Sequence, residues 1–267
     1  MNSEFGVEYH IVDSCNLRCA GCCHYSSLLD ELTYIPLSKM SHEFRLLASK
    51  TCSGSELKWL RLLGGEPLLH PEIVECLHLA RKFFPESDIS IVTNGLKLNS
   101  MEESFFKECG RLNIGVQITD YGLINLPELF ARMKDLGCRG ELYQTCRTWY
   151  YQSIRLTGGD HECYDNCRNR IYCRNFRDGR VYLCPQMAYV NIFSTYFGVN
   201  IPLGSNDSVD LLNVGAWPDL LNALNMLHPD FCRTHCNNLG HDGLPTMRGV
   251  RRLTEKRIDE FCEVNGQ

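Results

Sequence analysis

Three cysteines near the N-terminus have a spacing that suits a metal cluster. Cys15, Cys19 and Cys22 form a C-x3-C-x2-C run directly after the apolar segment from Val7 to Val12. Three thiolates at this spacing can hold three corners of a cubane iron–sulfur cluster, and the fourth iron then stays open for chemistry. Because the apolar segment is expected to be a strand, the run would lie at the carboxyl end of a first barrel strand, where barrel enzymes place their active sites.

A second motif, Gly64-Gly65-Glu66-Pro67, follows the next apolar segment, Leu57 to Leu63. The two motifs in this order resemble those of radical S-adenosylmethionine (SAM) enzymes over residues 5–150. The resemblance implies that the three cysteines bind a [4Fe–4S] cluster and that Glu66 contacts the SAM nitrogen. Gly21 departs from the family, in which many members have an aromatic residue before the third cysteine. The resemblance assigns SAM binding to the motif Gly64, Gly65, Glu66 and Pro67.

The first half of the chain alternates between strand and helix patterns, which predicts a parallel sheet with right-handed crossovers. The fold class expected is α/β, a partial (β/α)6 TIM-like barrel over residues 1–150 and a small Cys-rich α+β extension over residues 151–267. The expected strands are Val7–Val12, Leu57–Leu63, Ile89–Thr93, Ile114–Thr119 and Cys138–Tyr143. The expected helices are Ser38–Ser49 with Ser38 as its N-cap, Pro71–Phe84, Met101–Cys109, Leu126–Leu136, Ala216–Leu227 and Leu253–Cys262, and a hairpin is expected to turn at Asp178-Gly179 before Arg180–Leu183.

A second group of cysteines occupies the C-terminal part of the chain: Cys163, Cys167, Cys173, Cys184, Cys232 and Cys236. The piece from Gly179 to Cys184 resembles the Twitch and SPASM extensions of radical SAM enzymes. That resemblance implies one auxiliary [4Fe–4S] cluster, with Cys173, Cys184, Cys232 and Cys236 as its ligands. Two alternatives stay open: Cys163 or Cys167 replaces Cys173, or one of these two thiols donates a hydrogen atom. Zinc is the other metal that four thiolates suit.

Polar residues at the ends of later strands are candidates for contacts to SAM or to substrate. In the family, positions such as Thr93, Asn94, Thr119 and Asp120 contact the ribose and carboxylate of SAM, although each also suits a helix N-cap or a turn. Gln117 and Gln144 are candidates for the barrel interior. The aromatic and basic residues that would cross the barrel mouth suit either a polar substrate or packing between domains; these are Arg147, Trp149, Tyr150, Tyr151 and Arg155.

Composition and charge limit the partners and the compartment expected for this chain. The net charge is −5 and no long basic run occurs, so nucleic acid is not expected as the main partner. No apolar run is long enough to span a membrane, and the N-terminus has no signal-peptide pattern. The chain has 16 cysteines, grouped in metal-ligand spacings, which indicates a reducing cytoplasm.

The resemblance predicts an enzyme that cleaves SAM to a 5′-deoxyadenosyl radical and takes a hydrogen atom from a small polar molecule such as a sugar, an aminocyclitol or a nucleotide. Oxidation or epimerisation is the expected outcome, with flavodoxin or ferredoxin as the reductant. The alternatives are a ribosomal-peptide maturase that forms thioether or carbon–carbon crosslinks, and an activase of a partner protein. A maturase is less expected because the barrel begins by residue 5, which leaves no room ahead of it for a leader-binding domain.

Overall fold

The computed structural model describes residues 5–19, 21–145, 154–156, 164, 167, 169–236 and 262–263. Among these residues the main sheet has eight strands in the order β5-β4-β3-β2-β1-β7-β8-β9. The strands on the N-terminal side pair in parallel, each with the next along the chain. They are β1 (Gly6–Val12), β2 (Trp59–Gly64), β3 (Asp88–Thr93), β4 (Ile114–Asp120) and β5 (Gly140–Thr145). The predicted parallel α/β sheet is confirmed for this part of the chain.

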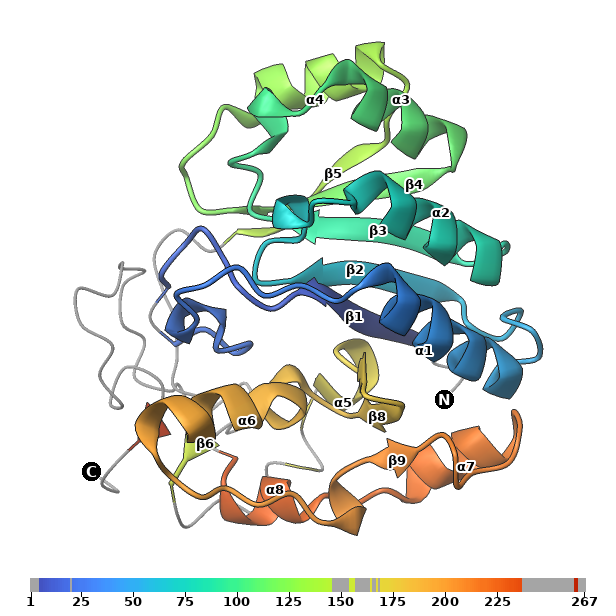
Figure 1. Ribbon diagram of the computed structural model, residues 1–267, viewed down its shortest axis with the longest axis vertical. Helices are drawn as coiled ribbons and strands as arrows, with labels where there is room; N and C mark the ends of the chain where they lie inside the picture. The colour runs from blue at the N-terminus through green and yellow to red at the C-terminus, as the bar shows by residue number, and fades with distance from the viewer. Residues whose placement is uncertain are drawn as a thin grey trace.

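A helix follows each of the first four strands. These helices are α1 (Leu37–Lys50), α2 (Ile73–Phe83), α3 (Glu103–Arg111) and α4 (Leu126–Asp135), all close to their predicted bounds. In Figure 1, α3 and α4 lie at the β5 end of the sheet. The prediction of Ser38 as an N-cap is wrong, because α1 begins at Leu37 and Pro36 occupies the N-cap position. Proline is favoured just before or within the first turn of a helix, where it loses no intrahelical hydrogen bond.

The C-terminal part of the chain extends the same sheet on the other side of β1. The β7 strand runs parallel to β1, with Glu8 opposite Asn175, and the antiparallel strands β8 and β9 follow. The hairpin turns at Asp178-Gly179 as predicted, with φ values of 50° and 71° that match a type I′ turn. The elements here are α5 (Asn169–Tyr172), β7 (Asn175–Arg177), β8 (Arg180–Tyr182), α6 (Pro185–Phe197), β9 (Val209–Asp210), α7 (Asp219–Met226) and α8 (Asp230–Thr234).

Two expectations for this part need correction. The helix predicted over Leu253–Cys262 does not include Cys262, which lies in the short strand β10 (Cys262–Glu263), while residues 253–261 lie outside the described residues. The β10 strand pairs in parallel with β6 (Ile154–Arg155) in a separate two-stranded sheet. The predicted helix at Ala216–Leu227 is confirmed as α7, although it begins only at Asp219.

Over the residues that it describes, the structure shows a sheet of parallel strands and does not show a barrel. The sheet contains the first five strands that a (β/α)6 partial barrel needs, and a helix follows each of the first four. In the described part of the chain, the strand that follows β5 belongs to the small sheet instead of extending the main one. The sixth unit, the closure of the barrel and the domain boundary near residue 150 therefore stay predictions.

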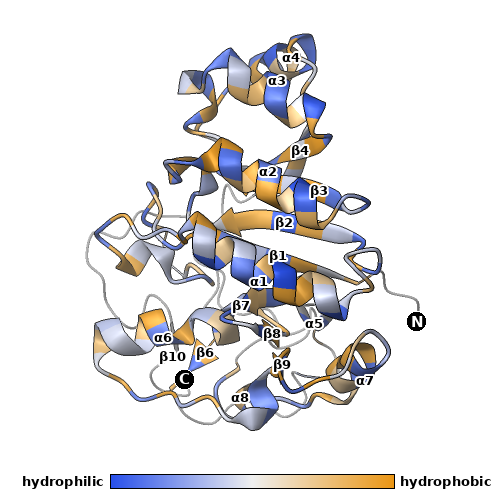
Figure 2. Ribbon diagram, turned by 45° about the vertical axis from the view of Figure 1, so that its right-hand side comes forward, coloured by the Kyte–Doolittle hydropathy of each residue, from blue (hydrophilic) through white to orange (hydrophobic). Residues whose placement is uncertain are grey.

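The hydrophobic core occupies the space between the sheet and its helices. Every residue of β1 is buried, as expected for a central parallel strand with both faces covered. Figure 2 shows β2 in the colour of hydrophobic residues, whereas α1 alternates between hydrophobic and hydrophilic, as an amphipathic helix does. Phe176 and Val181 of the hairpin belong to the same core cluster as Phe44 of α1. No helix in the described ranges has the length and apolar character that a membrane crossing needs.

Candidate functional site

The three-cysteine run forms a loop at the carboxyl end of β1, as predicted. Cys15, Cys19 and Cys22 are all partly buried. The Cys15 Sγ accepts hydrogen bonds from the Leu17 N–H at 3.4 Å and from the side-chain amide of Asn94 at 3.8 Å. Burial raises the pKa of the Cys15 thiol, and the negative charges of Cys22, Glu66 and Cys19 raise it further. Cys19 and Cys22 thus both influence the Cys15 thiol.

The Gly64-Gly65 pair lies directly against this loop. The Gly65 N–H donates to the Val12 carbonyl at 2.9 Å, and the Glu66 N–H donates to the Ser14 carbonyl at 3.0 Å. A Cβ at Gly64, whose φ is +148°, would lie 1.8 Å from the Val12 carbonyl oxygen. A Cβ at Gly65 would lie 2.1 Å from the Ser14 carbonyl oxygen. Only glycine permits the backbone to approach the loop this closely.

Glu66 is fully buried and organises the ends of β2 and β3. Its carboxylate accepts hydrogen bonds from the Thr93 hydroxyl at 2.6 Å, the Asn94 N–H at 2.9 Å and the Leu68 N–H at 3.1 Å. Burial raises the pKa of this carboxyl, and the three hydrogen bonds oppose that shift. Asn94 in turn donates to the Asn16 side chain at 2.7 Å. Glu66 therefore links β3 to the cysteine loop through Asn94, and its contact to the SAM nitrogen stays a prediction.

The other predicted SAM contacts also make local turns. The Asn94 side chain accepts from the Leu96 N–H at 3.0 Å, and the Asp120 side chain accepts from the Gly122 N–H at 2.7 Å. Both are Asx turns, so the turn alternative noted for these residue types holds here. Thr119 lies beside Asp120 at the end of β4 and is buried. The strand ends thus present these side chains along the edge of the sheet that carries the cysteine loop.

The cysteine loop supplies the three thiols that a cubane cluster with one open iron requires. Within the described ranges, no group of three or more His, Cys, Asp or Glu side chains is arranged to hold a metal ion. A cubane cluster binds each thiolate at a different iron, so its three sulfur ligands surround a volume and do not converge on one point. Neighbouring thiols on a partly buried loop suit that arrangement.

The structure also gathers thiols in the C-terminal part. The charges of Cys232, Cys167 and Cys173 add to burial in raising the pKa of Cys184. Cys184 lies between the β7–β8 hairpin and the start of α6, and Cys236 forms a backbone bridge with Ile154. Cys173, Cys232 and Cys167 thus each influence the Cys184 thiol. Cys163 lies outside the described residues.

The described candidates for substrate contact lie on three different strands. The Gln117 side chain donates to Glu141 at 3.1 Å, and its carbonyl oxygen is buried without a hydrogen-bond partner. Gln144 is exposed at the end of β5, and Arg155 lies in β6. The other candidates, Arg147, Trp149, Tyr150 and Tyr151, lie outside the described residues.

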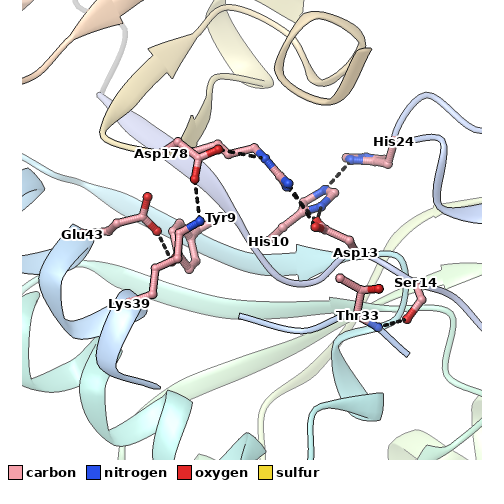
Figure 3. Close-up of polar contacts among 10 residues, drawn as sticks. Tyr9, His10, Asp13, Ser14, His24, Thr33, Lys39, Glu43 and Asp178 are labelled. Atoms are coloured by element: carbon pink, nitrogen blue, oxygen red, sulfur yellow. Dashed lines mark hydrogen bonds and ion pairs between the residues drawn. The ribbon is translucent and has the colours of Figure 1, made fainter. Parts of the chain in front are cut away.

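Sequence reasoning missed a buried polar network beside the cysteine loop. Figure 3 shows His10, Asp13 and His24 pointing toward one another near the end of β1. A signal for part of it was available, because Glu8 and His10 are polar residues two positions apart in an apolar strand and so share a face. Its fourth member, Arg177, comes from the hairpin, and no pattern in the sequence brings that residue to Asp13.

Comparison with known sequences agrees with the N-terminal motifs. Residues 6–117 match the family described as a 4Fe-4S single cluster domain. The GTP 3',8-cyclase of Microcystis aeruginosa is 32% identical over 144 residues, which are 52% of this chain and 40% of that protein. The GTP 3',8-cyclase of Lactiplantibacillus plantarum is 32% identical over 113 residues, 41% of this chain and 32% of that protein. The chain thus spans less than half the length of these curated relatives.

Solved structures with some likeness include BtrN in an open conformation and Streptococcus suis SuiB bound to S-adenosylmethionine. For BtrN the TM-score is 0.47 at 16% identity, over 89% of this chain and 94% of that chain. For SuiB the TM-score is 0.39 at 17% identity, over 52% of this chain and 34% of that chain. The sequence matches, taken with the cysteine loop and the Gly-Gly-Glu-Pro segment packed against it, support the radical SAM superfamily for the part of the chain that carries both motifs, with a [4Fe–4S] cluster as its cofactor.

Proposed function

We propose that this protein is a radical SAM enzyme that acts on a small polar substrate. The observation that carries the proposal is the packing of Gly64 and Gly65 against the loop of Cys15, Cys19 and Cys22, because it brings both motifs to one edge of the sheet. When bound, the cluster and SAM supply a 5′-deoxyadenosyl radical that takes a hydrogen atom from the substrate.

The residues of the chain bind and orient these groups. Three thiolates from the loop would hold the cluster and leave one iron for the amino and carboxylate groups of SAM. Glu66 holds Thr93 and Asn94 at the end of β3, where their polar atoms face the same edge as the loop. Thr119 and Asp120 at the end of β4 are proposed to contact the ribose. Pro67 begins the short turn Pro67–Leu69 and fixes the direction in which the chain leaves Glu66.

The sequence relatives suggest which substrates to test first. Curated proteins that match part of this chain include GTP 3',8-cyclases. A purine nucleotide is therefore the first member of the small polar class to test, ahead of sugars and aminocyclitols. Flavodoxin or ferredoxin is proposed as the reductant.

We assign one auxiliary [4Fe–4S] cluster to the C-terminal cysteines. The hairpin that carries Cys173 and Cys184, the position of Cys184 at the start of α6 and the effects of Cys232, Cys167 and Cys173 on the Cys184 thiol support this assignment. Cys167 remains the alternative to Cys173 as a ligand and also a candidate hydrogen-atom donor. A ligand and a donor respond differently to removal: Cys167→Ala lowers the iron content if Cys167 is a ligand. If it is a donor, the iron stays and the variant cleaves SAM but stalls at a substrate radical.

Iron content after anaerobic reconstitution tests the assignment of both sites. We expect about eight irons in the wild type and about four when Cys15, Cys19 and Cys22 are all changed to Ala, at four per cluster. The triple variant should also lose reductive cleavage of SAM. About four irons falling to none would leave the radical SAM site standing and remove the auxiliary cluster. Unchanged iron and SAM cleavage in the triple variant would overturn the proposed function.

A further inference from the structure

A buried hydrogen-bond network joins the cysteine loop to the β7–β8 hairpin. His10 Nδ1 lies 2.9 Å from Asp13 Oδ1, and His10 Nε2 lies 2.7 Å from His24 Nδ1. The Nη1 and Nη2 groups of Arg177 donate to the two oxygens of Asp13 at 2.8 Å and 3.1 Å. One carboxylate thus receives side chains from β1 and from the hairpin.

The hydrogen bonds of this network form one continuous chain. His10 bridges Asp13 and His24 through its two ring nitrogens, and Asp13 joins His10 to Arg177. A carboxylate that pairs with an arginine accepts hydrogen bonds, so His10 Nδ1 donates to Asp13 and His10 Nε2 faces His24.

Packing around the network restricts its geometry. The Tyr189 ring stacks on His10 with 3.6 Å between ring centroids and 12° between the planes. The Arg177 guanidinium lies over the Tyr189 ring, with its carbon 4.8 Å from the ring centroid. His10 and Asp13 are buried, and hydrogen bonds are stronger where water is excluded. A two-pronged arginine–carboxylate contact fixes an angle as well as a distance, so the hairpin has little freedom to move relative to β1.

The positions of these residues along the chain give the network its significance. Asp13 precedes Cys15 by two residues, and His24 follows Cys22 by two residues, so the network holds both ends of the cysteine loop. Arg177 lies between Cys173 and Cys184 in the hairpin. A single set of contacts therefore touches the segments that carry both proposed cluster sites.

We infer that Arg177 is a positioning residue which, through Asp13 and His10, couples the two cysteine sites, so that a cluster held by one site slows the loss of the cluster from the other. The inference rests on the proposed auxiliary site. Each cluster orders its own loop, and the network passes that order to the other loop. Coupling of this kind is reciprocal, because each site stabilises the other by the same free energy.

The test compares iron release from the whole protein with release from its separate sites. Three reconstituted proteins are exposed to excess chelator without oxygen: the wild type, the variant with Cys15, Cys19 and Cys22 changed to Ala, and the variant with Cys184 and Cys232 changed to Ala. Without coupling, the wild-type time course equals the sum of the two single-site time courses. We expect wild-type release to be slower than that sum, because each bound cluster keeps the loop of the other in place.

The same comparison is then repeated with Arg177→Gln in all three proteins. We expect the wild-type-derived time course now to equal the sum of the two single-site time courses, because the link between the sites is lost. Arg177→Lys keeps the charge but not the two-pronged contact, so its time course should depart from the sum by an intermediate amount. It replaces Arg177→Gln as the test variant if Arg177→Gln folds poorly. Arg180→Gln is the matched control, because it breaks an ion pair of the same hairpin with Asp210 at 2.9 Å, and it should leave the coupling intact.

Two results would overturn the inference. Wild-type release that equals the sum shows that the sites are independent, and a departure from the sum that persists in Arg177→Gln shows that another contact couples them. Failure of the auxiliary site is distinguished from these by the iron count, because the wild type would then hold about four irons instead of about eight.

Discussion

Glu8 is a carboxyl group in the middle of a buried strand, with 4% of its side chain exposed. Burial raises its pKa to about 7, although Arg61 at 3.6 Å and a hydrogen bond from Asn175 oppose that shift. The fold therefore favours the protonated form more than the unfolded chain does. Near neutral pH this residue is poised between its two charge states inside the sheet.

The sign of the resulting pH dependence follows from this shift. The folded protein binds a proton at Glu8 between pH 4.5 and about 7 that the unfolded chain has already lost, so stability falls as pH rises through this window. Glu8→Gln removes this loss of stability, which is of the order of 3 kcal/mol over the whole titration window. The free energy of unfolding of the apoprotein, measured in urea, should therefore fall less from pH 5 to pH 8 for Glu8→Gln than for the wild type.

Glu103→Gln is the control for that prediction. Glu103 is exposed and pairs with Lys107 on the surface of α3, so its substitution should leave the wild-type pH dependence nearly unchanged. Equal decreases in the wild type and in Glu8→Gln would show that Glu8 does not retain its proton in the fold.

At the scale of elements, the approach of β2 to the cysteine loop leaves no room for a side chain. Gly65→Ala would place a methyl group 2.1 Å from the Ser14 carbonyl oxygen and 2.8 Å from the Cys15 nitrogen. Overpacking of this kind costs about 1–3 kcal/mol and shifts the backbone. We expect the variant to hold fewer irons at the N-terminal site and to bind SAM more weakly, as measured by iron analysis and calorimetry.

Gly204→Ala is the control for this prediction, because the surroundings of Gly204 leave room for a methyl group. At Gly204 the nearest atom to an added Cβ lies at 3.7 Å, an ordinary contact. Gly204→Ala should keep the wild-type iron content. If Gly65→Ala also keeps it, the close contact at the loop is not needed for cluster binding.

Local patterns predicted the elements of the sheet well, because alternating burial and turn residues are local properties. Strands β1 to β4 and their helices lie within a few residues of the predicted bounds. The sequence analysis missed α6, although Pro185 marks its first turn. Residues from Gln186 to Phe193 are buried around most of its circumference, so the helix lacks the polar face by which an amphipathic helix is found.

The candidate site was predictable to a similar degree. The contact between Gly65 and the cysteine loop follows from adjacent parallel strands, whose carboxyl ends meet at one edge. The pairing of Asp13 with Arg177 joins residues far apart in sequence, and no periodicity or motif encodes it. Such contacts depend on how the hairpin packs against β1, which only the folded chain determines.

At the scale of the whole molecule, one hydrophobic core crosses the predicted boundary near residue 150. Leu224 of α7 and Phe176 of β7 belong to the same buried cluster as Leu60 of β2. We therefore predict a single unfolding transition in denaturant, at which circular dichroism and the fluorescence of the tryptophans coincide.

Leu224→Ala tests this cooperativity. Leu224 is 5% exposed, so its truncation should cost about 2–5 kcal/mol and shift both probes equally. Leu212→Ala, at a residue 74% exposed, should change little. A shift seen with one probe alone would mean that the two parts of the chain unfold independently.

The place of β1 in the sheet has a consequence for synthesis. The β1 strand leaves the ribosome shortly before β2, but its other neighbour begins only at Asn175. At about 5–20 residues per second, this edge of β1 stays open for roughly ten to thirty seconds, with Glu8 and His10 lacking their later partners. An unpaired edge invites pairing with other chains. The nascent protein is thus most vulnerable to aggregation before its hairpin emerges, and chaperone capture at that stage would raise its yield.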